Sequence, residues 1–381
     1  MRRVYLDHNA STPIAPEVVE AMRPFFAAHF GNPSSAHWAG RPAKEAVERA
    51  RGQVAALLGA APEEIVFTSG GTEANNHALT GVYFAHRARG AHLITTAVEH
   101  PAVLEPCRFL RGLGAEVTVL PVDGTGRVDP GAVHKAITPR TILISVMHAN
   151  NEVGTIQPLA EIGRIAREHG VLFHSDAAQS VGKIAAKVDD LNVDLLSVAG
   201  HKLYAPKGVG ALYVRKGVQI EPFMHGAGHE RGRRAGTENV LLDVGLGAAC
   251  ELAARWVDSP DTRTLRDRFW ELLREAFGPR VVLNGHPTER LPNTLNVSFV
   301  GHVGAEILHG IEGLAASTGA ACHSGTVELS PVLKAMGVPP EVGKGAIRFS
   351  LGRGTTLDEL TWVVEALKKE LLAGVSGGRG A

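Results

Sequence analysis

Between about residues 45 and 215, short apolar runs alternate with longer amphipathic segments. The apolar runs are typical of buried strands, and the segments between them have the residue spacing of helices. This alternation indicates βα units, which build a mostly parallel sheet covered by helices on both faces. The expected strands are 64–68, 93–96, 116–120, 141–146, 171–174, 194–198 and 210–214, and the expected helices include 72–85, 102–113 and 159–169.

The pattern changes after about residue 258, where charged helical segments flank strands that alternate polar and apolar residues. Residues 262–277 and 357–372 are predicted as helices, and 294–299 and 346–350 as half-buried strands. We therefore expect a large α/β domain over residues 16–257 and a smaller α+β domain. The smaller domain would combine residues 1–15 with residues 258–381.

Charge and cysteine content exclude several classes of protein. Lys plus Arg and Asp plus Glu both number 39, which argues against charge-driven binding to nucleic acid or to a membrane surface. No apolar run reaches the roughly 18 residues of a membrane span, and the start of the chain lacks the apolar region of a signal peptide. The three cysteines (Cys107, Cys250 and Cys322) form neither a disulfide framework nor a zinc motif. A cytoplasmic protein without metal is expected.

One lysine lies at a position where a binding or catalytic role is expected. The apolar run 193–198 ends in Gly200-His201-Lys202, which puts Lys202 at the carboxyl end of a predicted buried strand. Open α/β sheets bind their ligands at this edge, and a lysine there can form a Schiff base with a carbonyl cofactor. For a lone lysine, a surface position on a loop is the commoner case.

Three other strand ends carry polar residues with a possible role. Residues 68–76 include Gly70, Gly71 and Thr72 before a predicted helix, which suits a phosphate or an ordinary capped turn. Asp176 follows the strand at 171–174 and could pair with a protonated ring nitrogen or cap a helix. His100 could stack on a planar ring and move protons, although most histidines do neither.

Taken in order, these motifs resemble those of one family. The phosphate turn, the histidine, Asn150-Asn151-Glu152-Val153-Gly154, the aspartate and Gly200-His201-Lys202 follow one another as in the cysteine desulfurases. These enzymes form part of the class V branch of the fold type I pyridoxal-phosphate (PLP) enzymes. The resemblance extends from residues 5–7 to 348–353 and implies the α/β fold type I architecture, PLP as cofactor and a homodimer.

The resemblance also implies roles for residues around the cofactor ring. Lys202 resembles the lysine that forms the Schiff base and removes the substrate Cα proton. Asp176 resembles the partner of the ring nitrogen, Gln179 the hydrogen-bond donor to the ring hydroxyl, and His100 the histidine stacked on the ring.

Further roles concern the phosphate and the substrate carboxylate. Gly71, Thr72 and His201 resemble phosphate contacts, and Thr237 resembles the contact given by the neighbouring subunit. Asn151 resembles a contact to cofactor and substrate. Arg348 resembles the arginine that binds the substrate carboxylate, a task suited to its bidentate fork.

The chain departs from the family pattern at two positions near the lysine. Ala199 occupies a place that is usually serine, so one hydroxyl contact to the phosphate is missing unless Ser197 supplies it. Ala205 replaces the usual glycine before Pro206. Neither change removes a catalytic group.

Cys322 decides which PLP reaction is expected. It lies among small residues in 317–325, which indicates an accessible loop, whereas Cys107 and Cys250 are predicted to be small core residues. From these residues alone, a structural cysteine remains plausible. The resemblance implies the nucleophile that receives sulfur, so that L-cysteine becomes L-alanine and a persulfide on Cys322. An iron–sulfur scaffold, a tRNA-thiolation pathway or another sulfur carrier would accept this sulfur.

Three alternatives remain open at this level. Gly319-Ala320-Ala321-Cys322-His323-Ser324 and Ala199 resemble selenocysteine lyases, which would act on L-selenocysteine. Gly325 and the interval from Cys322 to Ser330 favour the desulfurase. A class V aminotransferase would use the same cofactor site without Cys322, and a non-catalytic scaffold is the least favoured alternative.

Overall fold

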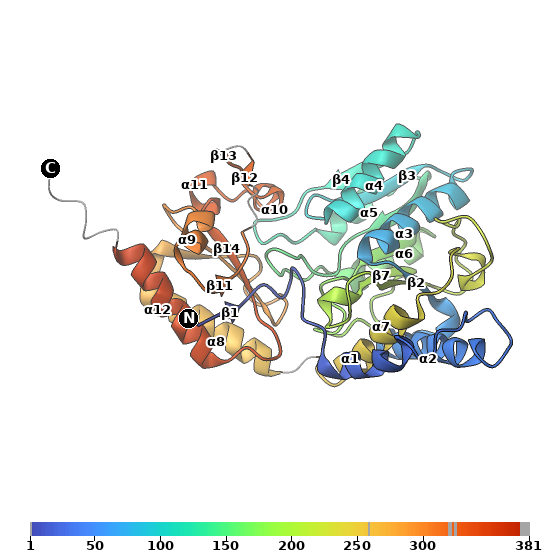
Figure 1. Cartoon of the computed structure of the whole chain (residues 1–381). Coiled ribbons are helices and arrows are strands. Elements are labelled where there is room, and N and C mark those ends of the chain that lie inside the picture. Colours follow the sequence, from blue (N-terminus) through green and yellow to red (C-terminus); the bar gives the residue numbers. More distant parts are fainter. Residues whose placement is uncertain (1, 258–259, 319–321, 324–325, 374–381) are drawn as a thin grey trace.

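The computed structural model describes residues 2–257, 260–318, 322–323 and 326–373 (Figure 1). A large sheet with helices on both faces forms one part of the molecule, and a smaller group of strands and helices forms the other. The strand β1 (Val4–Tyr5) lies in the smaller part, so the chain crosses to the large sheet soon after it begins.

The central sheet is mostly parallel. Within the described residues its strand order is β2-β8-β7-β6-β5-β3-β4. Strand β8 runs antiparallel to both neighbours, and the pairs from β7 to β4 are parallel. The strands are β2 (Ile65–Thr68), β3 (His92–Thr96), β4 (Glu116–Leu120), β5 (Thr141–Ser145), β6 (Leu172–Asp176), β7 (Leu195–Ala199) and β8 (Gly210–Val214). The predicted α/β fold class is therefore confirmed.

Helices bury both faces of this sheet. Neighbouring residues of one strand, such as Leu195 and Leu196, belong to different hydrophobic clusters because successive side chains point to opposite faces. Helices α3 and α4 cover one face, and α1, α2, α5, α6 and α7 contribute to the cluster on the other. Their bounds are α1 (Pro16–Met22), α2 (Gly40–Leu58), α3 (Gly71–His86), α4 (Pro101–Gly112), α5 (Pro130–Ala136), α6 (Leu159–Glu168) and α7 (Val240–Ala253).

The smaller part contains a three-stranded antiparallel sheet in the order β14-β10-β9. T-shaped ring pairs, Phe269 with Phe349 and Phe277 with Phe299, lie in its core. Its elements are α8 (Pro260–Phe277), β9 (Val281–Asn284), β10 (Thr294–Phe299), α9 (Gly304–Gly310), β11 (Leu314–Ala315), β12 (Cys322–His323), β13 (Thr326–Val327), α10 (Pro331–Ala335), α11 (Pro340–Gly343), β14 (Ala346–Ser350) and α12 (Leu357–Ala373). The boundaries at 16 and 257 stay a prediction.

The prediction that β10 and β14 are half-buried is wrong, because every residue of both strands is buried. Their apolar residues face the core beneath α8 and α12. Their polar residues are covered by the segments that lead to the large sheet: Asn296 donates to the carbonyl of Glu152, and Arg348 to the carbonyl of Asn151. A polar strand face thus lies at the junction of the two parts.

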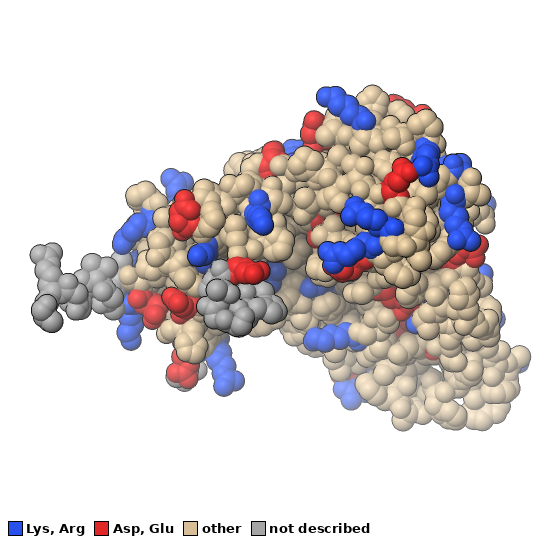
Figure 2. Space-filling view, turned by 90° about the horizontal axis from the view of Figure 1, so that it is seen from above, with Lys and Arg blue, Asp and Glu red and all other residues tan. Residues whose placement is uncertain are grey.

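The surface matches the balanced composition. Basic and acidic side chains are interspersed on the face seen in Figure 2. In the described ranges, no helix has the length and apolar character needed to cross a membrane. The same ranges hold no group of three or more His, Cys, Asp or Glu side chains that could bind a metal ion.

A buried ion pair fastens the segment before α7 to the large sheet. Arg51 on α2 and Glu230 are both buried, and the guanidinium donates two hydrogen bonds of 2.7 and 2.8 Å to the carboxylate. Glu230 also accepts from the backbone N–H of Phe67 on β2 at 2.9 Å. Glu230 and Arg231 have φ of 47° and 58°, a conformation that costs energy for residues other than glycine. The ion pair helps to hold this strained turn.

The ion pair generates a stability prediction. We expect Glu230→Ala to lower the free energy of unfolding by about 3–5 kcal/mol, because the buried Arg51 guanidinium then keeps only the half-exposed Glu48 as a carboxylate partner. Urea unfolding followed by circular dichroism measures the change. Glu168→Gln, which breaks the exposed pair with Arg164 on α6, serves as the control and should cost about 0.5 kcal/mol or less. Equal costs for the two variants would contradict the prediction.

Candidate active site

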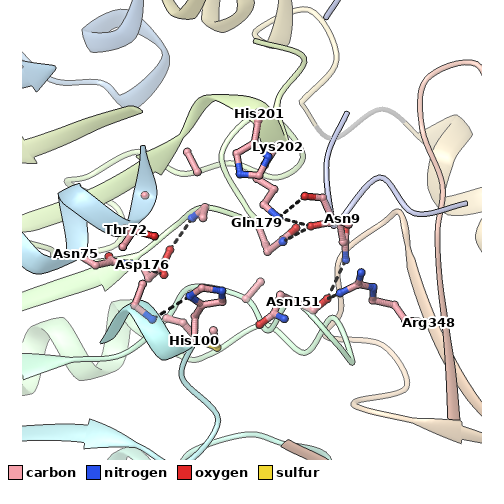
Figure 3. A pocket seen from close by; sticks show the side chains of 17 residues that line it. Asn9, Thr72, Asn75, His100, Asn151, Asp176, Gln179, His201, Lys202 and Arg348 are labelled. Carbon is pink, nitrogen blue, oxygen red and sulfur yellow. Dashed lines mark hydrogen bonds between the residues drawn. The ribbon is translucent and has the colours of Figure 1, made fainter. Parts of the chain in front are cut away.

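A cavity of about 370 Å³ lies at the carboxyl edge of the central sheet (Figure 3). The loops after β3, β5, β6 and β7 contribute to its wall, and Arg348 on β14 lines the side of the smaller part. The chain order reverses between β3 and β5, which is where open α/β sheets bind ligands. The cavity brings together most of the predicted site residues: Gly71, Thr72, His100, Asn151, Asp176, Gln179, His201, Lys202 and Arg348.

One end of the cavity is suited to an anion. Gly70 turns the chain from β2 into α3 with φ 148° and ψ −178°, a conformation that only glycine adopts freely. The N-terminus of α3 therefore presents backbone N–H groups that have no acceptor within the helix. A Cβ on Gly71 would come within 3.1 Å of the Cβ of Ala199, so glycine lets α3 approach β7 closely. Thr72 and His201 also line the cavity.

Ser197 does not replace the hydroxyl that is missing at Ala199. Its Oγ lies 3.0 Å from Nε2 of His174 in the buried sheet, and the residue does not line the cavity. The anion end therefore relies on the helix N-terminus, Thr72 and His201.

Asp176 has both carboxylate oxygens in fixed hydrogen bonds. Oδ2 accepts from Nδ2 of Asn75 at 2.7 Å, and Oδ1 accepts from the N–H of Ala178 at 2.9 Å. Asn75 also lines the cavity, and the sequence analysis missed it. The sequence feature that could have identified Asn75 is a polar residue on the side of α3 that faces the sheet, three positions after Thr72.

His100 caps α4 and turns one ring edge to the cavity. Its Nδ1 accepts from the N–H of Ala102 at 3.1 Å, so in the neutral ring the proton is on Nε2. Burial and the Lys202 charge lower the pKa of His100, against the opposite effect of Asp176. The ring is therefore mainly neutral at pH 7 and presents a donor.

Lys202 lies in a short 3₁₀ turn (Gly200–Lys202) directly after β7. Its Nζ donates to the carbonyl oxygens of Asn9 at 2.5 Å and Ala10 at 2.9 Å (Figure 3). Burial and the nearby charge of Arg348 lower the pKa of Lys202 to about 8, although Asp176 and Asp7 oppose this shift. A lysine with a pKa near 8 has a useful neutral fraction, as a nucleophile or base requires.

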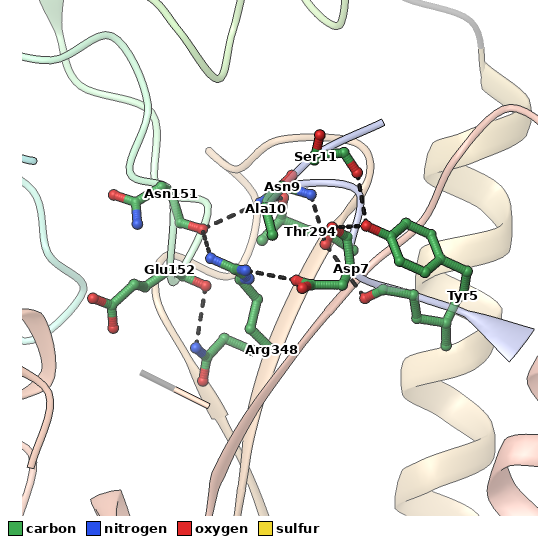
Figure 4. A network of polar contacts seen from close by, with 12 residues as sticks. Tyr5, Asp7, Asn9, Ala10, Ser11, Asn151, Glu152, Thr294 and Arg348 are labelled. Carbon is green, nitrogen blue, oxygen red and sulfur yellow. Dashed lines mark hydrogen bonds and ion pairs between the residues drawn. The ribbon is translucent and has the colours of Figure 1, made fainter. Parts of the chain in front are cut away.

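Hydrogen bonds to Asp7 and Asn151 hold the Arg348 guanidinium in place (Figure 4). One terminal nitrogen donates to Oδ1 of Asp7 at 2.7 Å and the other to the carbonyl of Asn151 at 3.0 Å. Tyr5 donates to the carbonyls of Asp7 and Ser11 and so fixes the segment that carries the aspartate. The guanidinium has five N–H donors, so it retains donors for a ligand carboxylate.

Asn9 joins the two parts of the molecule and was also missed. Its Nδ2 donates to Oγ1 of Thr294 at 2.8 Å and to the carbonyl of Asn151 at 3.2 Å. Its carbonyl accepts from Nε2 of Gln179 at 2.9 Å as well as from Lys202. These partners are at least 142 residues away in sequence, so no local pattern marks Asn9.

Two predicted residues are not placed at the cavity by the described part of the structure. Thr237 is exposed in the segment before α7, so its predicted role in a neighbouring subunit stays a prediction. The backbone of Cys322 pairs with Val327 in the β12–β13 hairpin. The side chain of Cys322 and the predicted loop residues 319–321 and 324–325 lie outside the described residues.

The segment that contains Cys322 begins and ends beside residues near the cavity. Ser317 exchanges two backbone hydrogen bonds with Arg348, of 3.2 and 2.7 Å. At the other end, the hydroxyl of Ser330 donates to Glu152, the neighbour of Asn151. The ends of this segment thus adjoin the side of the cavity that Arg348 lines.

Comparisons with known proteins show the family of the chain. The aminotransferase class-V family model matches residues 4–363. The chain is 51% identical over 372 residues to the cysteine desulfurase IscS of Dictyoglomus turgidum, covering 97% of this chain and 94% of that protein. It is 46% identical over 370 residues to a human cysteine desulfurase, covering 96% and 81% of the two chains.

Solved structures give the same result. A NifS-like protein superposes with a TM-score of 0.91 at 38% identity and covers 98% of this chain and 100% of its own. A structure described as SspA in complex with cysteine superposes with a TM-score of 0.82 at 39% identity, covering 91% and 98%. This chain therefore belongs to the class-V aminotransferase family and, within it, to the cysteine desulfurases.

Proposed function

We propose that this protein is a PLP-dependent cysteine desulfurase, which converts L-cysteine to L-alanine and leaves the sulfur as a persulfide on Cys322. The observation that supports it is the joint placement of four groups in one cavity. Lys202 supplies an amine of lowered pKa, Asp176 a fixed carboxylate, α3 an anion-binding N-terminus and Arg348 a guanidinium. Because the chain belongs to the desulfurase family, we interpret these four groups as a site for PLP and L-cysteine.

The residues of the cavity fit PLP. The N-terminus of α3, Thr72 and His201 offer donors for its phosphate, and Asp176 offers an acceptor for a protonated ring nitrogen. Lys202 is the amine that would bind its aldehyde carbon. When bound, PLP would draw away the electrons that proton removal leaves at the substrate Cα.

Different side chains of the protein would then carry out the separate steps of the reaction. Arg348 binds the substrate carboxylate and so orients the Cα proton towards Lys202, whose neutral amine accepts it. His100 presents the Nε2 proton at the reacting groups. The Cys322 thiolate attacks the substrate sulfur, so that an S–S bond forms while the C–S bond breaks.

The product then passes its sulfur on. We propose that an acceptor protein, such as an iron–sulfur scaffold or a sulfur carrier, takes the terminal sulfur of the persulfide. We also propose a homodimer in which Thr237 reaches the anion end of the partner's cavity. The exposure of Thr237 supports this.

The central test is removal of the thiol. Cys322→Ala should keep the absorbance of bound PLP but release no sulfide from L-cysteine under reductant, because the sulfur has no acceptor. Sulfide assay and absorbance measure the two properties. Cys250→Ala, which changes a cysteine buried in α7, is the matched control and should keep its turnover. Undiminished sulfide release by Cys322→Ala would overturn the assignment.

The same variants separate the desulfurase from a selenocysteine lyase. A desulfurase needs the thiol for L-cysteine and turns this substrate over well. A lyase would favour L-selenocysteine and could release selenium from it without Cys322. We expect wild type to turn over L-cysteine and Cys322→Ala to lose that activity; a wild type active on L-selenocysteine alone would favour the lyase.

The lowered pKa of Lys202 predicts a pH dependence for cofactor loading. Only the neutral amine attacks an aldehyde, and its fraction grows as pH rises through the pKa of about 8. Loading of cofactor-free protein with PLP, followed by absorbance, should accelerate from pH 6 to about 8 and then level off. A blocked free lysine, with a pKa of about 10.4, is the reference and should keep accelerating beyond pH 9. Parallel profiles would contradict the prediction.

The proposed contact between Arg348 and the substrate carboxylate predicts that replacing this residue weakens substrate binding. Arg348→Lys keeps the positive charge but loses the fork, so kcat/KM for L-cysteine should fall by about 10- to 100-fold, mainly through KM. Steady-state kinetics measure the split. Arg108→Lys, at an exposed site on α4 paired with Glu105, is the control and should change neither constant. An unchanged KM in Arg348→Lys would contradict the proposed carboxylate contact.

A further inference from the structure

A second lysine, Lys183, contacts the same Asn9 residue as Lys202, and the proposed reaction gives it no role. Lys183 follows the loop after β6, and its Nζ donates to Oε1 of Gln179 at 2.9 Å and to Oδ1 of Asn9 at 3.4 Å. Both partners are amide oxygens and neither is a carboxylate. A lysine that is largely removed from solvent usually pairs with a carboxylate, and Lys183 is half-buried, so its pairing with two amides needs a different explanation.

Lys183 and the carbonyl of Asn9 together fix which way the Gln179 amide points. An ammonium group donates hydrogen bonds and cannot accept them, so Gln179 must turn its oxygen to Lys183. The NH₂ group of Gln179 then donates to the carbonyl of Asn9 at 2.9 Å, which leaves its second hydrogen without an acceptor among the described residues. Gln179 lines the cavity, so this hydrogen is available to a bound ligand.

Asn9 is oriented in the same way. Its Oδ1 accepts from Lys183 and from Nδ2 of Asn293 at 3.0 Å, while its Nδ2 donates to Thr294 and to the carbonyl of Asn151. One ammonium therefore orders two amides that meet at the base of the cavity. Without it, the Gln179 amide keeps only the carbonyl of Asn9 to fix its orientation, whereas Asn9 is still fixed by the carbonyl of Asn151.

We propose that Lys183 is a positioning residue that holds the Gln179 amide with its NH₂ group towards the cavity, where it donates to an anionic oxygen of the bound ligand. This inference rests on the proposed function, in which that ligand is PLP and the oxygen is its ring hydroxyl in ionised form.

The charges around Lys183 favour a bound anion there. Burial lowers the pKa of Lys183 to about 7, and the charges of Lys202 and Arg348 add to this effect. His8 and His201 also face it, and burial lowers the pKa of each to about 4, so both are neutral at pH 7. An anionic oxygen bound to Gln179 would offset the cationic surroundings and favour the ammonium form of Lys183.

The test measures the absorbance of the bound cofactor rather than the turnover of substrate. PLP bound to Lys202 changes its absorbance with pH, and the deprotonated form concentrates negative charge on the ring oxygen. A donor to that oxygen stabilises the deprotonated form. Lys183→Met should therefore raise the pH midpoint of the absorbance change by about one unit in the loaded protein.

Two further variants identify the cause. In a Gln179→Leu background, which has no amide to orient, Lys183→Met should shift the midpoint far less than in wild type. Lys187→Met, which removes a lysine bonded to the carbonyl of Ala56, is the matched control and should leave the midpoint unchanged. If Lys183→Met does not fold, Lys183→Gln replaces it, since it keeps a polar side chain without the charge.

The outcomes are distinct. An unshifted midpoint in Lys183→Met overturns the inference, and so does an equal shift in the Gln179→Leu background, because the lysine would then act by its charge alone. A wild-type protein that never acquires the absorbance of bound PLP overturns the proposed function, and this inference with it. A wild type that titrates beside an unshifted variant overturns the inference alone.

Discussion

The parallel pairing of β3, β5, β6 and β7 is the constraint on which the site depends. Parallel strands end at the same edge of a sheet, so the loops that follow them meet there although they are far apart in sequence. His100 and Lys202 follow β3 and β7, Asp176 is the last residue of β6, and all three line one cavity. Burial of both sheet faces holds the strands in register and keeps these loops in place.

The cavity is closed by a polar junction rather than by an apolar one. The segment from Asp7 to Ala10 lies between the smaller sheet and the carboxyl edge of the large one, and it contacts Arg348, Gln179 and Lys202. Hydrogen bonds are directional, so this junction fixes the distance and angle between the lysine and the guanidinium. The same junction gathers cations, which together with burial lowers the pKa of Lys202.

Local patterns predicted much of the fold and most of the site. The strands 116–120 and 210–214 end where the structure ends them, because an apolar strand between turn residues is a local signal. Lys202, Asp176 and Thr72 were found because each follows such a strand. Asn9, Asn75 and Lys183 were missed, because an isolated Asn or Lys acquires its meaning from partners that only the folded chain brings near.

The sequence by itself determined the fold class, the family and the identity of the groups that can do chemistry, since these follow from periodicity and from residue types in a fixed order. The tertiary structure decided how those groups are oriented and charged. It showed that Ser197 bonds to His174 instead of replacing the hydroxyl missing at Ala199, and that the polar face of β10 and β14 is buried at the junction. Burial, hydrogen-bond direction and electrostatic shifts depend on what surrounds a side chain in space, and the order of residues along the chain does not contain that information.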